Sequence, residues 1–171
     1  IASRLSLQPM SEFPQLRDAI EAATQTLRAL SSLEPQMAEA AGVIGHALRG
    51  GNKLLVCGNG GSAADASHFA TELVVRFAKD RRALPAICLV SDSGILTAAG
   101  NDYGFDEVFA RQVAAFGIAG DVLICLTTSG KSKNLIRALE EAKARKLKTI
   151  SFLGRDGGAM RPVLPRAVRR H

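Results

Sequence analysis

The sequence predicts an α/β fold: a doubly wound parallel sheet flanked by helices and preceded by an N-terminal helical hairpin. From Lys53 onward, short apolar runs alternate with longer segments of helical periodicity, and this alternation is typical of βαβ units. Two of the apolar runs end in loops rich in Gly, Ser or Thr that pass directly into a helical segment. Ligands of doubly wound sheets bind beside the carboxyl ends of the strands, so we expect the functional site at these two loops.

The segment before the sheet predicts two amphipathic helices. Apolar residues recur every three or four positions from Leu16 to Leu30, and Ser11 is a suitable N-cap. A second periodic stretch begins at Pro35 and stops at Gly50-Gly51, as helices often do. We expect the two helices to form a hairpin.

Four buried parallel strands are predicted next, each from a short run of apolar residues. They lie at residues 54–57, 86–90, 122–126 and 149–153. Helices are predicted between and after them, at residues 63–77, 93–100, 107–116 and 134–145. The run Asn101-Asp102-Tyr103-Gly104 breaks the apolar pattern with turn residues, and we expect a loop there that either contacts a ligand or turns the chain.

Length and composition indicate one globular domain with one core. A chain of 171 residues can bury roughly 70% of its unfolded surface. No apolar run approaches the roughly 18 residues of a membrane span, and Ile1 to Pro9 shows no secretory signal. We therefore expect a cytoplasmic protein that does not associate with a membrane.

The charge distribution argues against a nucleic-acid partner, and the cysteine spacing predicts thiols without a special function. Four of the 22 basic residues lie in the last eleven, and the remainder of the chain has 18 basic and 16 acidic residues. The body therefore lacks the basic surface that a nucleic-acid partner requires. The cysteines, Cys57, Cys88 and Cys125, lie among Leu, Ile and Val without CxxC spacing, which predicts buried reduced thiols.

The first predicted strand ends in Gly58-Asn59-Gly60-Gly61-Ser62. Glycines allow backbone N–H groups to approach an anion, and the helix N-terminus that follows supplies partial positive charge. Ser62 is suited either to cap the helix or to contact the ligand. With Ala63 the run also fits the dinucleotide pattern G-x-G-x-x-A, and a plain strand-to-helix turn would look similar.

The third predicted strand ends in Thr127-Thr128-Ser129-Gly130-Lys131-Ser132. This dense set of hydroxyl and N–H donors at a helix N-terminus suits a phosphate monoester, and the alternative is that the hydroxyls cap the helix. The frame G-x-x-x-x-G-K-[ST] of a P-loop is absent. ATP chemistry is therefore disfavoured.

His68 and Glu72 are four residues apart on the helix after the glycine loop. Both side chains therefore lie on one helix face, where they are able to bind a metal, move a proton, or form an ordinary surface pair. His46 lies among apolar residues of the second helix, which favours a packed or surface histidine.

Four motifs together resemble the sugar isomerase (SIS) domain family, in its order and spacing from about Ser11 to Met160. They are Gly58 to Asp65, His68-x-x-x-Glu72, Gly100 to Gly104, and Thr127 to Ser132. More narrowly, they resemble the sedoheptulose 7-phosphate isomerases, also called phosphoheptose isomerases. Thr127 stands where this family usually has serine, and the change keeps the hydroxyl.

The resemblance implies a cytoplasmic homotetramer that binds a phosphorylated seven-carbon sugar. The tetramer would convert sedoheptulose 7-phosphate to D-glycero-D-manno-heptose 7-phosphate through an enediol, a step toward the heptose of lipopolysaccharide or capsule. The resemblance implies that Glu72 is the catalytic residue and that His68 and Glu72 are two of the zinc ligands. The expected substrate-binding residues are Asn59, Gly60, Gly61, Ser62, Glu72, Asn101, Asp102, Thr127, Thr128, Ser129 and Ser132.

The last eleven residues depart from the family pattern. After Met160 the family continues with a strand and a long helix whose glutamine and histidine complete the zinc site. Here Arg161 to His171 contains two prolines within four residues, which argues against a helix. We therefore expect that last strand and helix to be missing and the zinc site to be incomplete. This leaves two alternatives, an active isomerase and an inactive chain that keeps the substrate loops and the base. The chain divides into three expected parts: an extension over residues 1–10, an SIS domain over 11–160 and a basic tail over 161–171.

Two other functions fit parts of the sequence. One is a non-catalytic SIS protein that binds a phosphosugar to regulate or scaffold a partner, which would be expected to lack Glu72. The other is a dinucleotide-binding oxidoreductase, in which Asp92 after the second strand would bind a ribose. That reading leaves the hydroxyl-rich loop at Thr127 unexplained.

Overall fold

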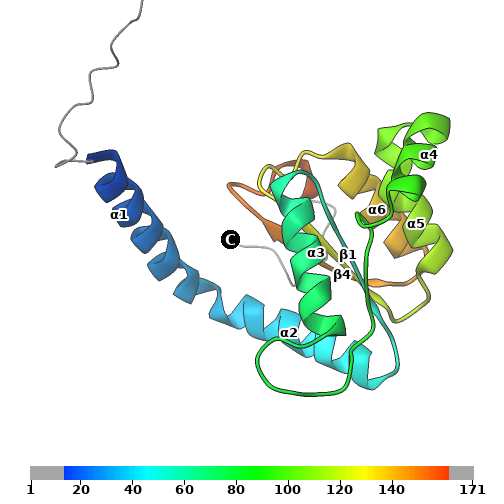
Figure 1. Cartoon of the computed structure of the whole chain (residues 1–171), viewed down its shortest axis with the longest axis horizontal. Helices are drawn as coiled ribbons and strands as arrows, with labels where there is room; N and C mark the ends of the chain where they lie inside the picture. Colours follow the sequence, from blue (N-terminus) through cyan, green and yellow to red (C-terminus); the bar gives the residue numbers. More distant parts are fainter. Residues whose placement is uncertain (1–13, 162–171) are drawn as a thin grey trace, which may run out of the picture. The chain divides into compact units, whose positions relative to one another are not determined.

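The computed structural model describes residues 14–161 (Figure 1). The chain divides into two units between Ala38 and Glu39, and each unit is described by itself. Within the described residues no helix has the length and apolar character needed to span a membrane.

The first unit is helical, as predicted. It contains α1 (Pro14–Ala29), the short 3-10 helix η1 (Leu30–Leu33) and the beginning of α2 (Glu34–Arg49). The cap predicted at Ser11 lies outside the described residues, and the hairpin packing of the two helices stays a prediction. The apolar stripe of α1 is exposed, with Leu16 59%, Ile20 58% and Leu27 67% accessible. An exposed apolar stripe of this size is typical of a surface that contacts another chain.

The second unit contains the predicted parallel sheet. Its strands are β1 (Leu54–Gly58), β2 (Ala86–Cys88), β3 (Val122–Thr127) and β4 (Lys148–Leu153), in the order β2-β1-β3-β4. All three pairings are parallel, with Leu54 opposite both Ala86 and Val122. Because β1 pairs with β2 on one side and β3 on the other, the winding reverses between β1 and β3.

Helices cover both faces of this sheet, and each face has its own apolar core. Leu54 and Val56 point to the side of α3 (Gly61–Val74) and the later part of α2. Leu55 and Cys57 point to the other side, where three helices bury the larger cluster. These are α4 (Ser93–Tyr103), α5 (Val108–Phe116) and α6 (Lys133–Ala144). Strand residues thus alternate between two cores, which explains why β1, β2 and β3 are apolar at nearly every position.

The cysteines agree with the predicted reduced thiols. All three are free; Cys57 and Cys125 are fully buried and Cys88 is half-buried. Cys57 and Cys125 lie opposite each other on β1 and β3 with their Sγ atoms 3.7 Å apart. The contact with the Cys125 thiol and burial together raise the pKa of Cys57 well above its ordinary value.

Three predicted boundaries were wrong. α3 ends at Val74, three residues before Phe77, and the Arg81 guanidinium donates hydrogen bonds to the carbonyl groups of Glu72 and Leu73, which occupies acceptors at the end of that helix. The second strand stops at Cys88 rather than residue 90. The loop predicted at residues 101–104 is instead the last turn of α4, which ends at Gly104 with φ 87°. Polar residues persist in that turn because they are exposed.

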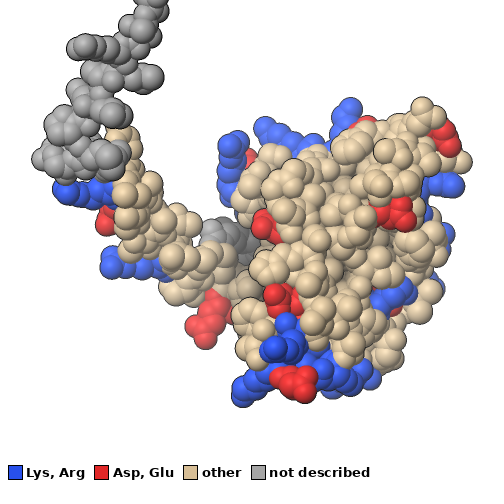
Figure 2. All heavy atoms as spheres, viewed as in Figure 1, with Lys and Arg blue, Asp and Glu red and all other residues tan. Residues whose placement is uncertain are grey.

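Charged side chains of both signs are distributed over the surface of the second unit. Figure 2 shows Lys and Arg gathered at its lower end, where the irregular segment after α3 runs in Figure 1. This segment contains Arg76, Lys79, Asp80, Arg81 and Arg82.

A buried carboxylate fastens the amino ends of β1 and β3. Asp121 has no exposed surface, and its oxygens accept hydrogen bonds from the Lys53 N–H (3.0 Å), the Lys53 Nζ (2.6 Å) and the Ile118 N–H (3.0 Å). A fourth hydrogen bond, at 3.3 Å, comes from the Asn52 amide. Burial alone would raise the pKa of Asp121, but these donors outweigh it and lower the pKa.

Asp121→Asn is expected to lower the free energy of unfolding by about 3 kcal/mol at pH 7, because it leaves the Lys53 ammonium without its anion. Because the pKa of Asp121 is lower in the native state than in the unfolded chain, its ionised carboxylate stabilises the native state above about pH 4. This stabilisation is lost as the pH falls through the native pKa. Urea unfolding from pH 7 downward should therefore show a difference between the two proteins that is constant above about pH 4 and shrinks at lower pH. The exposed Asp106→Asn is the control, and a constant difference at every pH would contradict the assignment.

Candidate active site

The two loops predicted to bind the ligand lie side by side at the carboxyl edge of the sheet. β1 and β3 are neighbours, and Gly58 at the end of β1 is opposite Leu126, one residue before the end of β3. The winding of the sheet reverses between these two strands, and such a switch point is where ligands of α/β proteins bind.

The glycine loop turns tightly into α3. A Cβ on Gly58 would lie 2.5 Å from the Ser62 carbonyl oxygen, so no larger residue fits there. Gly60 is the N-cap residue with φ 58°, and within residues 14–161 no side chain caps this helix. Ser62 therefore does not act as the cap, which was one of its two predicted roles. Its hydroxyl is available to a ligand, whereas the N–H groups of Ser62 and Ala63 donate to the carbonyl groups of Asn59 (3.1 Å) and Gly60 (3.0 Å).

Two hydroxyls of the hydroxyl loop accept hydrogen bonds within the turn, and the other two accept none from the described part of the chain. The Thr127 Oγ1 accepts a hydrogen bond from the Gly130 N–H (3.2 Å), and the Ser129 Oγ accepts one from the Lys131 N–H (3.3 Å). These two hydroxyls shape the turn and each retains a proton to donate. Thr128 is exposed, and Ser132 is the N-cap residue of α6 without a capping hydrogen bond from any described side chain. The part of the alternative in which the hydroxyls cap the helix is thus wrong, while phosphate binding by the loop stays a prediction.

A second glycine-rich segment, residues 154–160, supports the hydroxyl loop through its backbone. A Cβ on Gly130 would lie 2.0 Å from the Gly157 carbonyl oxygen, and one on Gly158 would lie 2.4 Å from the Ser129 carbonyl oxygen. The Met160 N–H donates to the Gly130 carbonyl at 3.0 Å. Such close approach of two backbones requires glycine on both sides, so the shape of the loop depends on both segments.

An amide pair joins the two loops, and sequence reasoning missed one of its members. The Asn59 Nδ2 donates to the Asn134 Oδ1 (3.0 Å), and the Asn134 Nδ2 donates to the Asn59 Oδ1 (2.9 Å). Asn134 lies in the first turn of α6 and is 2% exposed. The one signal in the sequence was a polar residue just before the apolar face of that helix begins.

His68 and Glu72 lie on α3, after the glycine loop. The His68 Nε2 and the Glu72 Oε1 are 3.0 Å apart, with 74% of the histidine side chain and 31% of the glutamate side chain exposed. The pair is open to solvent and to a ligand. A zinc ion in a protein needs four ligands, one of which is water at catalytic sites, and no group of three or more candidate metal ligands occurs among residues 14–161. The described donors therefore fit part of a zinc site.

Asn101 and Asp102 are not brought to these loops by any hydrogen bond among the described residues. Both are exposed in the last turn of α4, and the Asn101 Nδ2 donates to the Asp102 Oδ1 at 2.8 Å. Their role in the pocket stays a prediction. His46 is exposed on α2, in agreement with a surface histidine.

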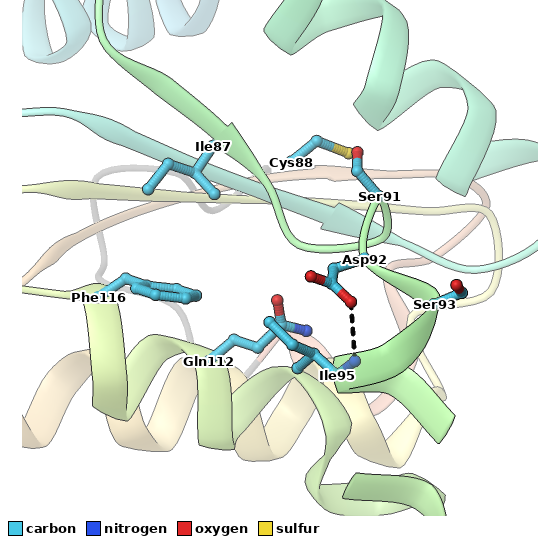
Figure 3. A pocket seen from close by; sticks show the side chains of 8 residues that line it. All are labelled: Ile87, Cys88, Ser91, Asp92, Ser93, Ile95, Gln112 and Phe116. Carbon is cyan, nitrogen blue, oxygen red and sulfur yellow. Dashed lines mark hydrogen bonds between the residues drawn. The ribbon is translucent and has the colours of Figure 1, made fainter. Parts of the chain in front are cut away.

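A separate open cavity of about 540 Å³ lies between β2 and α5 (Figure 3). Asp92 lies in its wall, where its Oδ1 accepts the Ile95 N–H at 2.9 Å and caps α4. Gln112 in the opposite wall donates to two backbone carbonyl groups, those of Leu89 and Val108. Asp92 therefore serves as a helix cap through one of its two carboxylate oxygens, and its role as a ribose ligand stays a prediction of the oxidoreductase alternative.

Comparisons with known proteins agree with the motifs. The family model described as "SIS domain" matches residues 19–154. A phosphoheptose isomerase of Geobacter metallireducens is 50% identical over 155 residues, covering 91% of this chain and 79% of that protein. One of Pelobacter propionicus is 56% identical over 136 residues, covering 80% and 72%. The solved structure of a phosphoheptose isomerase from Francisella tularensis has a TM-score of 0.86 and 40% identity, covering 90% and 81%.

Proposed function

The chain belongs to the SIS domain family and, within it, to the phosphoheptose isomerases, and we propose that it interconverts sedoheptulose 7-phosphate and D-glycero-D-manno-heptose 7-phosphate. The observation that carries the proposal is the joining of the glycine loop and the hydroxyl loop at the switch point of the sheet, with an accessible carboxylate, Glu72, on the helix that the glycine loop begins. A regulatory phosphosugar-binding protein would need the loops and would not need this carboxylate.

The hydroxyl loop would hold the phosphate. Thr128 and Ser132 have hydroxyls that no described residue engages as a cap, and Thr127 and Ser129 each have a proton to donate. The first N–H groups of α6 add partial positive charge. Asn59, Gly60, Gly61 and Ser62 would contact the sugar, with Asn101 and Asp102 as further predicted contacts.

Glu72 would transfer the proton. In the forward reaction its carboxylate removes a proton from the first carbon of the ketose, and the electron pair moves to give an enediol. The same carboxylic acid then returns a proton to the second carbon. The oxygen on the second carbon has gained a proton and the oxygen on the first carbon loses one, so that the carbonyl forms at the first carbon. General acid–base catalysis of this kind contributes about 10²- to 10⁴-fold to a rate.

We include zinc in the proposal, bound through His68 and Glu72 with further ligands from outside the described residues. When bound, zinc would polarise the sugar oxygens. The neutral histidine and the carboxylate are suitable ligands, and their 3.0 Å separation allows both to reach one ion. The part of the chain described here orients these two side chains on one helix face.

We also propose an assembly and a location for the protein. A homotetramer would bury the apolar stripe of α1, which the first unit leaves exposed, and the reaction would take place in the cytoplasm as a step toward the heptose of lipopolysaccharide or capsule. Supporting evidence for the tetramer is the stripe itself, because isolated helices of this length gain stability mainly from packing.

The proposed activity is tested with two proteins: the 171-residue chain, and an extended chain in which residues 1–160 continue into the C-terminal segment of the Geobacter metallireducens relative. We expect the extended chain to convert sedoheptulose 7-phosphate to the aldose, as followed by NMR of the anomeric proton. If it binds the phosphosugar and never interconverts ketose and aldose, the protein is a binding module and the isomerase proposal is wrong.

His68→Ala in the extended chain is expected to lower zinc affinity by more than the about 10- to 100-fold that loss of a second-shell partner costs, because a direct ligand is lost. Competition with a chromogenic chelator measures the affinity directly. His46→Ala is the matched control, since that histidine is exposed on α2. Equal zinc affinity in the His68 variant and the control would remove His68 from the metal site.

Ile20→Glu in α1 is expected to reduce the assembly to smaller species, because it places a charge in the apolar stripe. Light scattering coupled to size-exclusion chromatography gives the mass. Gln25→Glu, on the opposite face of the same helix, introduces the same charge and should leave the mass unchanged. A tetramer that survives Ile20→Glu would show that α1 does not form the interface.

A further inference from the structure

The amide pair between Asn59 and Asn134 connects segments that are 75 residues apart. Asn59 belongs to the loop after β1, and Asn134 belongs to the first turn of α6, directly after the hydroxyl loop. The pair therefore spans the switch point between β1 and β3. It is a side-chain contact between the predicted sugar-binding loop and the helix that follows the predicted phosphate-binding loop.

The geometry of the pair fixes the orientation of both amides. Each side chain donates one hydrogen bond and accepts one, at 3.0 and 2.9 Å. Turning either amide by 180° would place two donors and two acceptors against each other, and a buried amide without its partner is costly. Asn134 is 2% exposed, so water does not replace the lost bonds. The orientation of Asn59 is thus determined by Asn134.

Asn59 keeps hydrogen-bonding capacity after this pairing. An amide has two N–H donors and two acceptor positions, and the pair uses one of each. No other hydrogen bond involves the Asn59 side chain within the described part of the chain. One donor and one acceptor remain, which suits a sugar hydroxyl, a group that itself both donates and accepts.

The hydroxyl loop is also supported by a segment other than α6, the one at residues 154–160. The Gly157-Gly158 segment contacts Ser129 and Gly130 through backbone atoms, and Met160 donates to the Gly130 carbonyl. Loss of the Asn134 side chain therefore leaves the Thr127–Gly130 turn with its own hydrogen bonds. The effect on the phosphate and the effect on the sugar are separable.

We propose that Asn134 is a positioning residue for substrate recognition: it holds the Asn59 amide in the orientation that binds the sugar hydroxyls, without contacting the substrate itself. The inference rests on the proposed function, since it takes Asn59 as a sugar contact. It assigns to α6 a part in sugar recognition in addition to its predicted part in phosphate binding.

Two probes separate the sugar contact from the phosphate contact in the 171-residue chain. Inorganic phosphate tests the hydroxyl loop alone. The alditol 7-phosphate made by reducing sedoheptulose 7-phosphate carries the sugar hydroxyls and cannot isomerise. Asn134→Leu, which keeps the volume, and Asn134→Ala are compared with Lys143→Ala, an exposed residue near the other end of α6. Thermal unfolding of each variant establishes that it is folded.

We expect the Asn134 variants to bind the alditol phosphate about 10-fold or more weakly, with less than about a 3-fold change for inorganic phosphate. In a double-mutant cycle, Asn59→Ala combined with Asn134→Ala should lose no more alditol affinity than Asn59→Ala alone, because Asn134 acts through Asn59. The side-chain NH₂ resonances of Asn59 should also shift in Asn134→Leu.

Equal losses for the two probes, or additive losses in the cycle, would overturn the inference and assign Asn134 a general structural role. Unchanged alditol binding in both folded variants would overturn it as well. A wild-type chain that binds the alditol phosphate no more tightly than inorganic phosphate would instead contradict the proposed function, and the inference would fail with it.

Discussion

Glu72→Gln is expected to lower kcat for isomerisation by about 1,000-fold or more in the extended chain, because it removes the base and weakens a proposed zinc ligand. The amide keeps the size of the side chain and its capacity to accept a hydrogen bond, but it does not accept a proton at neutral pH. The substitution therefore affects both the proton transfer and the proposed zinc site. Glu72 lies near the end of α3 and its side chain is 31% exposed, so the substitution leaves no buried group unpaired.

The measurement is a comparison of kcat and KM with those of Glu39→Gln. Glu39 is an exposed carboxylate on α2, and its variant should retain wild-type kinetics. Solvent deuterium incorporation at the second carbon gives an independent readout, because proton return to that carbon requires the base. A Glu72→Gln protein with more than about a tenth of wild-type kcat would show that another group moves the proton.

Gly130→Ala is expected to destabilise the protein by about 2–4 kcal/mol and to abolish measurable phosphate binding. The residue has φ 62°, and its new Cβ would lie 2.0 Å from the Gly157 carbonyl oxygen. Neither the dihedral angle nor the distance is compatible with alanine, so the turn must open. The donors of the hydroxyl loop then lose their common orientation.

Gly42→Ala is the matched control for this substitution. Gly42 lies within α2, and an added Cβ has no atom within 4 Å. The control should raise the free energy of unfolding by about 0.5–1 kcal/mol, because alanine is the better helix former. Urea unfolding and phosphate titration of both variants make the comparison. Normal stability in Gly130→Ala would mean that the contact between the two glycine segments is not required.

The sheet and the two loops that we propose to bind the ligand had predictable positions, because each rests on short-range signals. Buried parallel strands read as apolar runs, and the runs at Leu54 and Val122 match β1 and β3 closely. The loops carry glycine and hydroxyl residues in positions that physical chemistry associates with anions. The adjacency of those two loops follows from the strand order, which the sequence pattern left open.

The contacts that organise the site were not predictable, because they connect residues that are distant in the sequence. Asn134 has the appearance of an ordinary first-turn residue until Asn59 is placed opposite it. The close backbone contact between Gly130 and Gly157 likewise depends on where β4 leads the chain. Asn101 and Asp102 suggested a loop by composition, yet their exposure allowed the helix to continue through them.

The two cysteines at the centre of the sheet make the opening of the sheet measurable by thiol alkylation. Cys57 and Cys125 have no exposed surface, and the raised pKa of Cys57 keeps its reactive thiolate scarce. An alkylating reagent therefore reaches them only when β1 and β3 separate, whereas the half-buried Cys88 on the edge strand β2 reacts after a smaller opening. The order in which the three thiols are modified shows whether the sheet opens from its edge or all at once. The native cysteines are sufficient for this measurement.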